Sequence, residues 1–179
     1  IGLALARLHL TPNSLTLIGL VLSAGVAAIL ATGHLRIGGV AVLIAAAFDM
    51  LDGALARATG RVTRFGAFLD SSLDRYGEAL VLLGLLIHYS LGSGGQTETI
   101  LIYVTIVGSL MISYTRARAE GLGLTLEVGL LQRPERIIIL ALGLVFGLAV
   151  WALWLLAVLT NVTAAQRIVH VWRKTRYER

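Results

Sequence analysis

Four aspartates, spaced as two close pairs within apolar sequence, are the residues best suited to chemistry. Asp49 and Asp52 are three positions apart, and Asp70 and Asp74 are four apart. Either spacing places both carboxylates on one face of a helix. Carboxylates that converge in this way repel one another unless a cation lies between them. Because their oxygens are hard ligands, the pattern predicts a site for Mg²⁺, Mn²⁺ or Ca²⁺ rather than for zinc.

The residues around the aspartates indicate a phosphorylated ligand. Paired divalent ions recur in phosphoryl chemistry, where they neutralise a diphosphate and stabilise the leaving oxygen. Gly53 and Gly66 share the acidic faces and would let a large ligand approach the backbone. Arg57 can hold a phosphate through two parallel hydrogen bonds. The structural alternative is that Asp–Arg pairs only join helices, and four aspartates on two matched faces make it the weaker interpretation.

The composition places these residues in a membrane. The chain has 179 residues, of which 57% are hydrophobic and 14% charged, whereas soluble domains carry about 25% charged residues. It has no cysteine, which excludes disulfides and thiolate metal sites. We attribute the net charge of +5 to cytoplasmic Lys and Arg and to affinity for anionic lipid and phosphate, not to nucleic-acid binding. The first residue is isoleucine, so we expect either a trimmed natural N-terminus or a segment of a longer protein.

The apolar runs predict an all-α integral membrane protein with six transmembrane helices in a single domain, 1–179. A short interfacial helix is expected over 1–10, followed by spans at 14–32, 36–58, 65–88, 99–116 and two within 137–166. At about 1.5 Å per residue the last stretch is ~45 Å long, too long for one span. We therefore expect a tight turn near 147–150. The short connection 59–63 predicts that the second and third spans are antiparallel neighbours.

The basic residues test this topology. With six spans, every Lys and Arg except Arg36 falls on one side, which identifies that side as the cytoplasm. A five-span chain would place the basic C-terminal tail outside, so we reject it. Both termini and the aspartates are therefore expected at the cytoplasmic side of the cell membrane.

The residues from Asp49 to Asp74 also form a recognisable motif. Asp49-x2-Asp52-Gly53-x2-Ala56-Arg57-x8-Gly66-x3-Asp70-x3-Asp74 resembles the complete signature of the CDP-alcohol phosphotransferases. The resemblance implies a phospholipid-synthesising transferase, which moves the phosphatidyl group of CDP-diacylglycerol onto an alcohol and releases CMP. It also implies a homodimer, and it implies two Mg²⁺ or Mn²⁺ ions held by Asp49, Asp52, Asp70 and Asp74.

The same resemblance assigns further roles. Asp74 is implied as the general base that takes the proton of the acceptor hydroxyl. The residues implied to bind the CDP-lipid are Pro12, Asn13, Ser14, Leu15, Gly53, Ala56, Arg57, Thr63 and Gly66.

Two further blocks, 113–120 and 132–136, bear on the acceptor. They resemble segments of phosphatidylinositol phosphate synthases, which implies an inositol 1-phosphate acceptor (1D-myo-inositol 3-phosphate). The phosphate is then expected to meet Arg116, Arg118, Arg136 and Arg173, with Arg167 as a further candidate. Arg133 is interpreted as a topology signal or lipid anchor, and Glu78 as a partner of Arg75 or Arg57.

Several alternatives remain open from the sequence. Glycerol 3-phosphate is also an anionic acceptor, so a phosphatidylglycerophosphate synthase is the close rival, and the donor could be an archaeal-type CDP-lipid. Intramembrane carboxylates also mark cation transporters, but no polar residues continue such a path beyond the midplane. A lipid-binding scaffold without activity is disfavoured because all four aspartates are present.

Overall fold

The computed structural model describes residues 11–59, 63–92, 95–126 and 128–176, and within 51–59 it describes only the course of the backbone. This part of the chain is all-α, as predicted. Its helices are α2 (Pro12–Ala31), α3 (Leu35–Thr59), α4 (Arg64–Leu91), α5 (Gln96–Glu120), α6 (Arg133–Val145) and α7 (Ala149–Thr175). The interfacial helix expected over 1–10 lies outside the described residues.

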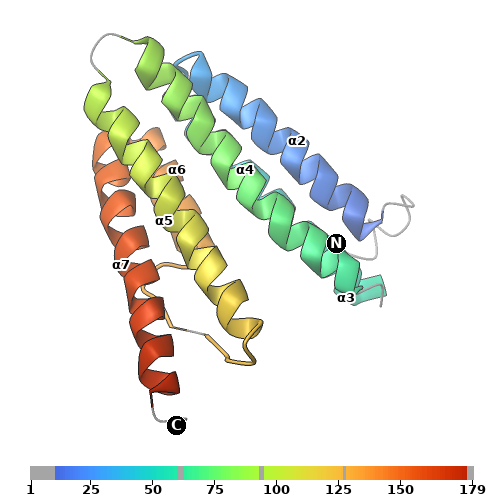
Figure 1. Ribbon diagram of the computed structural model, residues 1–179. Helices are drawn as coiled ribbons and strands as arrows, with labels where there is room; N and C mark the ends of the chain where they lie inside the picture. Colours follow the sequence, from blue (N-terminus) through green and yellow to red (C-terminus); the bar gives the residue numbers. More distant parts are fainter. Residues whose placement is uncertain (1–10, 60–62, 93–94, 127, 177–179) are drawn as a thin grey trace.

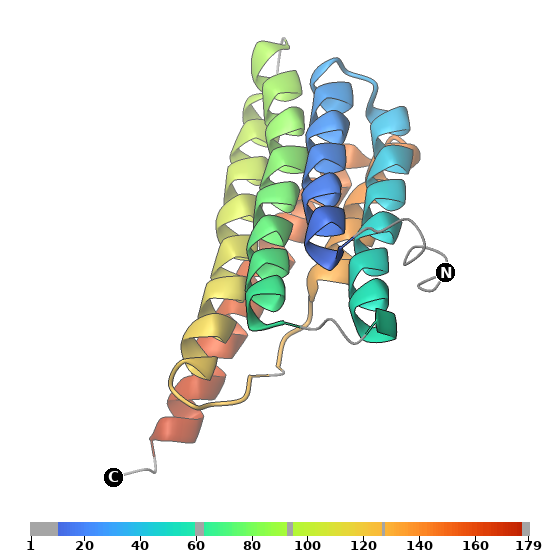
Figure 2. The ribbon, with the colours of Figure 1, turned by 90° about the vertical axis from the view of Figure 1, so that its right-hand side faces the viewer.

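The six helices form an antiparallel bundle in which the beginning of α2 and the end of α7 lie at the same end (Figures 1 and 2). α2 packs against both α3 and α4, α6 packs against α3 and α7, and α5 packs against α7 and α4. The prediction that the second and third spans are direct neighbours is wrong for the described residues, because α2 lies between α3 and α4 (Figure 2).

Small residues explain why α2 takes this central position. A Cβ atom added to Gly84 of α4 would lie 2.3 Å from the Ala27 carbonyl oxygen of α2, and one added to Gly77 would lie 3.0 Å from Ser23 Oγ. These glycines let the two backbones approach closely, which is how helices associate where no hydrophobic effect drives them together.

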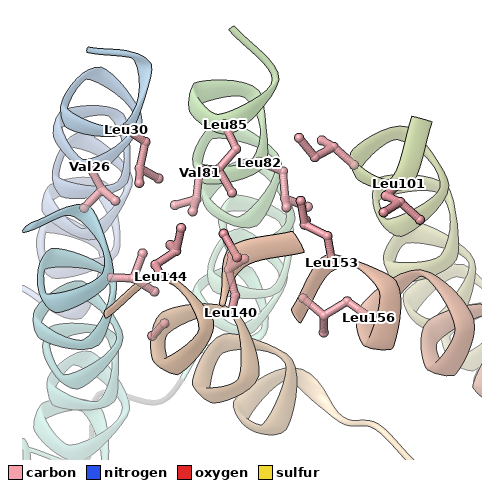
Figure 3. Close-up of a cluster of buried hydrophobic side chains, with 14 of the residues drawn as sticks. Val26, Leu30, Val81, Leu82, Leu85, Leu101, Leu140, Leu144, Leu153 and Leu156 are labelled. Atoms are coloured by element: carbon pink, nitrogen blue, oxygen red, sulfur yellow. The ribbon is translucent and has the colours of Figure 1, made fainter. Parts of the chain in front are cut away.

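The apolar core lies between the helices (Figure 3) and reaches Ala45 and Leu131, which are four and two residues from Asp49 and Arg133 along the chain. Leu30, Leu85, Leu144 and Leu153, from four different helices, are completely buried in it. Asp49 and Arg133 therefore line a pocket that core residues border.

Three helices, α2, α5 and α7, are long and apolar enough to cross a membrane. The aspartates in α3 and α4 stand in the half of each helix that adjoins the connection 60–63, and α6 has only 13 residues. The break predicted in the last apolar stretch is confirmed. α6 ends at Val145, and Gly147, with a φ of 73°, turns the chain into α7.

Candidate active site

The start of α6 is fixed by its own sequence. The backbone N–H of Gln132 donates to Glu135 Oε2 over 2.9 Å, and Pro134 lies in the first turn, where its missing N–H costs no helical hydrogen bond. The preceding Leu131 N–H donates to Thr163 Oγ1 of α7 over 3.2 Å. Arg133 and Arg136, three positions apart, therefore project from one face of an anchored helix end.

Arg133 joins two of the predicted aspartates. Its Nη2 donates a hydrogen bond to Asp49 Oδ2 of α3, and its Nη1 forms an ion pair with Asp74 Oδ1 of α4, both over 2.8 Å. The interpretation of Arg133 as a lipid anchor is therefore wrong. Pro134 and Glu135 start a helix here, and this helix directs the guanidinium into the bundle. Although α3 and α4 are separated by α2, their carboxylates meet at one depth.

Gly19 of α2 makes this meeting possible. A Cβ atom on Gly19 would lie 2.5 Å from Asp49 Oδ1, so the carboxylate passes directly over the glycine backbone on its way to Arg133. Sequence reasoning missed Gly19. The available signal was the repeat of small residues at four-residue spacing, Gly19, Ser23 and Ala27, which marks the face of α2 that helices approach closely.

The other two aspartates lie beside this pair along the chain. Asp70 is half-buried one turn before Asp74 on α4, and Asp52 lies on α3 one turn beyond Asp49, with its side chain outside the described residues. Within the described residues no three metal-ligating side chains converge. The chemical type of the donors still fits a hard divalent cation, because Asp49 and Asp74 direct carboxylate oxygens at one point, where a cationic group binds both.

One turn beyond Asp74, Glu78 accepts two hydrogen bonds from Arg136. Arg136 Nε and Nη2 each lie 2.8 Å from a Glu78 oxygen, and the two side chains are 4% and 14% exposed. The expected pairing of Glu78 with Arg75 or Arg57 is therefore replaced by one with Arg136. Arg75 instead donates to the Ser71 carbonyl oxygen and lies 3.7 Å from Asp74 Oδ2.

Two helix N-termini lie side by side at this end of the bundle. Thr63 caps α4 by accepting a hydrogen bond from the Gly66 N–H over 2.9 Å. A Cβ atom on Gly66 would lie 3.1 Å from Asn13 Oδ1, in the first turn of α2. Three residues predicted to bind the CDP-lipid, Asn13, Thr63 and Gly66, are thus brought together. The partial positive charge of each helix N-terminus favours an anion here.

Six further residues were predicted to bind the CDP-lipid, and the structure describes the surroundings of three of them, Pro12, Ser14 and Leu15. Ser14 closes the first turn of α2, with its Oγ 2.7 Å from Thr11 Oγ1, and Pro12 begins the helix. Leu15 is 2% exposed and packs inside the bundle. Gly53, Ala56 and Arg57 lie on the last turns of α3, and their surroundings are outside the described residues.

The arginines predicted to meet the acceptor occupy different settings. Arg116 is exposed and pairs with Glu120 over 2.8 Å, and Arg118 is exposed one half-turn further along α5. Arg173 lines a groove of about 710 Å³ between α7 and residues 128–130. Arg167 is buried, and it donates to the carbonyl oxygens of Ile112 and Val128, so it braces α5 and the following loop.

The chain is similar in sequence to relatives of known identity. The chain is 44% identical over 173 residues to the phosphatidylinositol phosphate synthase of Mycobacteroides abscessus, covering 92% of this chain and 79% of the relative. It is 39% identical to the archaetidylinositol phosphate synthase of Pyrococcus horikoshii, covering 94% and 87%.

Solved structures agree as well. Crystal structures of the Mycobacterium tuberculosis phosphatidylinositol phosphate synthase superpose with a TM-score of 0.90 at 36% identity over 96% of this chain. One of them contains manganese and citrate and covers 87% of that relative's chain, and another contains CDP-DAG and covers 91%. The family model described as CDP-alcohol phosphatidyltransferase matches residues 9–165, and this chain therefore belongs to that family.

Proposed function

We propose that the protein transfers the phosphatidyl-type group of a CDP-linked lipid to a hydroxyl of inositol phosphate and releases CMP. The observation that carries this proposal is the convergence of Asp49 and Asp74 on the cationic side chain of Arg133. The relatives named above, which include bacterial and archaeal inositol phosphate lipid synthases, favour this acceptor. They leave the diacylglycerol and archaeal-type donors as alternatives.

The proposal includes a place in the membrane. All six helices would cross it, with the aspartates and both ends of the chain at the cytoplasmic side. α6, at about 1.5 Å per residue, is ~20 Å long, shorter than a hydrocarbon core of about 30 Å. Its charged first turn would therefore lie within the cytoplasmic half of the membrane, level with Asp49 and Asp74. Following the family resemblance, we also propose a homodimer.

Metal and donor binding would use the two groups of residues described above. Asp49, Asp52, Asp70 and Asp74 would hold two divalent ions, Mg²⁺ or Mn²⁺, which neutralise the diphosphate of the donor. The manganese in the Mycobacterium tuberculosis relative supports this assignment. The N-termini of α2 and α4, with Asn13 and Gly66, would face the anionic part of the nucleotide.

The group transfer itself would be a single displacement. The acceptor hydroxyl oxygen attacks the β-phosphorus of the CDP-lipid, a new oxygen–phosphorus bond forms, and the bond to the bridging oxygen breaks. That oxygen leaves with its electron pair as part of CMP. Asp74 would take the hydroxyl proton. Its two oxygens face different cations, Arg133 and Arg75, so one oxygen can be occupied while the other accepts a proton.

Arginines would select a phosphorylated acceptor over free inositol. Arg116 and Arg118 are exposed near the end of α5, and Arg136 uses Nε and Nη2 for Glu78, which leaves Nη1 outside that pair. With Arg173, these groups would bind the acceptor phosphate through charge-assisted hydrogen bonds.

Purified protein incubated with labelled CDP-diacylglycerol, Mn²⁺ and a panel of acceptors tests the proposal. CMP release with inositol 1-phosphate, and not with inositol or glycerol 3-phosphate, is the expected result. Release with glycerol 3-phosphate alone would refute the acceptor, and would identify a phosphatidylglycerophosphate synthase instead. A parallel series with an archaeal-type CDP-lipid distinguishes the donors.

A further inference from the structure

Arg133 holds one oxygen of each of the two carboxylates. Its Nη2 donates a hydrogen bond to Asp49 Oδ2, and its Nη1 forms an ion pair with Asp74 Oδ1, both over 2.8 Å. The other oxygens have different neighbours, because Asp49 Oδ1 lies close to Gly19 and Asp74 Oδ2 lies 3.7 Å from Arg75 Nη1. Asp49 Oδ2 and Asp74 Oδ1 are therefore the two oxygens that one cationic group already joins.

A divalent ion that joined Asp49 and Asp74 would compete with Arg133 for Asp49 Oδ2 and Asp74 Oδ1. Mg²⁺ binds oxygen at about 2.0–2.1 Å and tolerates little deviation from octahedral geometry, whereas the guanidinium meets the two carboxylates through separate nitrogens at 2.8 Å. The ion and the planar guanidinium group cannot both lie between the two carboxylates. Binding of one requires displacement of the other.

We propose that Arg133 is an exchangeable counter-cation of the metal site, which holds Asp49 and Asp74 together until a divalent ion replaces it. This inference rests on the metal assignment in the proposed function. Arg133 is suited to exchange because its side chain is 27% exposed and long, and because it extends from the first turn of α6. Arg136, three residues later and 4% exposed, is fixed by both oxygens of one carboxylate.

The exchange has two physical consequences. Without a cation, the carboxylates of α3 and α4 would repel each other across α2, so Arg133 stabilises this end of the bundle before metal binds. The same contacts oppose metal binding, because a charge-assisted hydrogen bond to Asp49 and an ion pair with Asp74 must break first. Removing the guanidinium should therefore weaken the metal-free fold and strengthen metal affinity, two effects with opposite signs.

Mn²⁺ binding and thermal unfolding in detergent test this proposal. Free Mn²⁺ can be followed by electron paramagnetic resonance for the wild type, Arg133→Gln and Arg133→Lys, with Arg36→Gln at the opposite end of the bundle as the matched control. We expect Arg133→Gln to bind Mn²⁺ roughly tenfold more tightly or better. Its metal-free Tm should fall, and its Tm should rise more on Mn²⁺ addition than that of the wild type. Arg36→Gln should match the wild type in all three measurements.

Unchanged or weaker Mn²⁺ binding by Arg133→Gln would overturn the proposal, since it would mean that the guanidinium does not compete with the ion. If Arg133→Gln does not fold, the Mn²⁺ affinity of Arg133→Lys tests the exchange instead. Its single ammonium cannot hold both carboxylates through two nitrogens, so its Mn²⁺ affinity should lie above that of the wild type, and an equal or lower affinity would refute the exchange. Absence of Mn²⁺ binding to the wild type itself would instead refute the metal assignment on which the inference rests.

Discussion

Two arginines of α6, three residues apart, bind carboxylates that lie one turn apart on α4, yet the two settings differ. Arg136 gives two nitrogens to the single carboxylate of Glu78, and both partners are nearly buried. Arg133 divides its nitrogens between Asp49 and Asp74 on two helices, and its side chain is 27% exposed. Both contacts join an arginine of α6 to an acidic residue of α4. Residue type and position on the helix therefore do not distinguish the fixed pair from the exchangeable one.

The difference lies in burial and in how the oxygens are shared. A buried pair whose charges satisfy each other resists change, because either partner left alone would be an uncompensated buried charge. A partly exposed guanidinium that spans two carboxylates can leave for water, and the carboxylates can then take another cation. Along α4, the residue at the exchangeable contact is Asp74 and the one at the fixed contact is Glu78. We therefore expect substitutions at Asp74 to affect catalysis and those at Glu78 to affect stability.

Asp74→Asn should produce the largest effect. It removes the proposed base and one metal ligand while nearly preserving side-chain volume, so we expect CMP release to fall by about 10²–10⁴-fold. Thermal unfolding of the metal-free variant should change little, because the amide oxygen can still lie against the Arg133 guanidinium and Arg133 keeps its hydrogen bond to Asp49. Turnover near the wild-type rate would show that the Asp49–Asp74 pair is not the reactive centre.

Glu78→Gln should act on stability instead. It leaves the Arg136 guanidinium buried without a counter-charge, and breaking a buried pair in this way costs about 3–5 kcal/mol. Unfolding in a detergent titration should show this loss, whereas Mn²⁺ affinity of the folded fraction should stay close to the wild-type value. A Glu78→Gln variant that is as stable as the wild type but no longer binds Mn²⁺ would contradict the assignment of Glu78 to stability.

The convergence of Asp49 and Asp74 and the helical bundle could be predicted from sequence because spacing fixes which face of a helix a residue occupies. Asp49 and Asp74 could therefore be assigned to a common site. The neighbour relations could not be predicted, since the placement of α2 between α3 and α4 depends on the close approach of Gly77 and Gly84 to α2. The turn at Gly147 was predictable because an uncharged stretch longer than a membrane span must reverse.

The partners of Arg133 and Arg136 could not be predicted for a related reason. Basic residues near helix ends are expected from membrane topology alone. That expectation does not distinguish arginines at the surface from arginines that point into the bundle. The signal that was available is local. Gln132, Pro134 and Glu135 form a helix start, so the two arginines must share a face, and that face lies toward Asp74 and Glu78.

Gly19→Ala should have a smaller effect, confined to the exchangeable contact. The added methyl would lie 2.5 Å from Asp49 Oδ1, and because the carboxylate end is the group that can move, Asp49 would shift away from the site. Overpacking of this kind costs about 1–3 kcal/mol, so we expect Mn²⁺ affinity to fall by roughly tenfold. Gly25→Ala on the same helix, with nothing within 4 Å of the new methyl, is the control and should leave affinity unchanged. Equal Mn²⁺ affinities of Gly19→Ala and Gly25→Ala would show that Gly19 does not influence metal binding.

The smallest change in stability is expected when both members of the fixed pair are replaced together. Glu78→Leu combined with Arg136→Met places apolar groups against Val81, Leu82 and Leu140, in a pocket that Ser23, Thr105 and Arg133 also line. Such replacements of buried ion pairs are often neutral or stabilising. The free energy of unfolding of the double variant should therefore lie within about 1 kcal/mol of the wild-type value and well above that of Glu78→Gln. If Arg136 also contacts the acceptor phosphate through Nη1, this stable variant should show a raised KM for inositol phosphate and an unchanged KM for the CDP-lipid. An unchanged KM for inositol phosphate would show that Arg136 pairs with Glu78 but does not bind the acceptor.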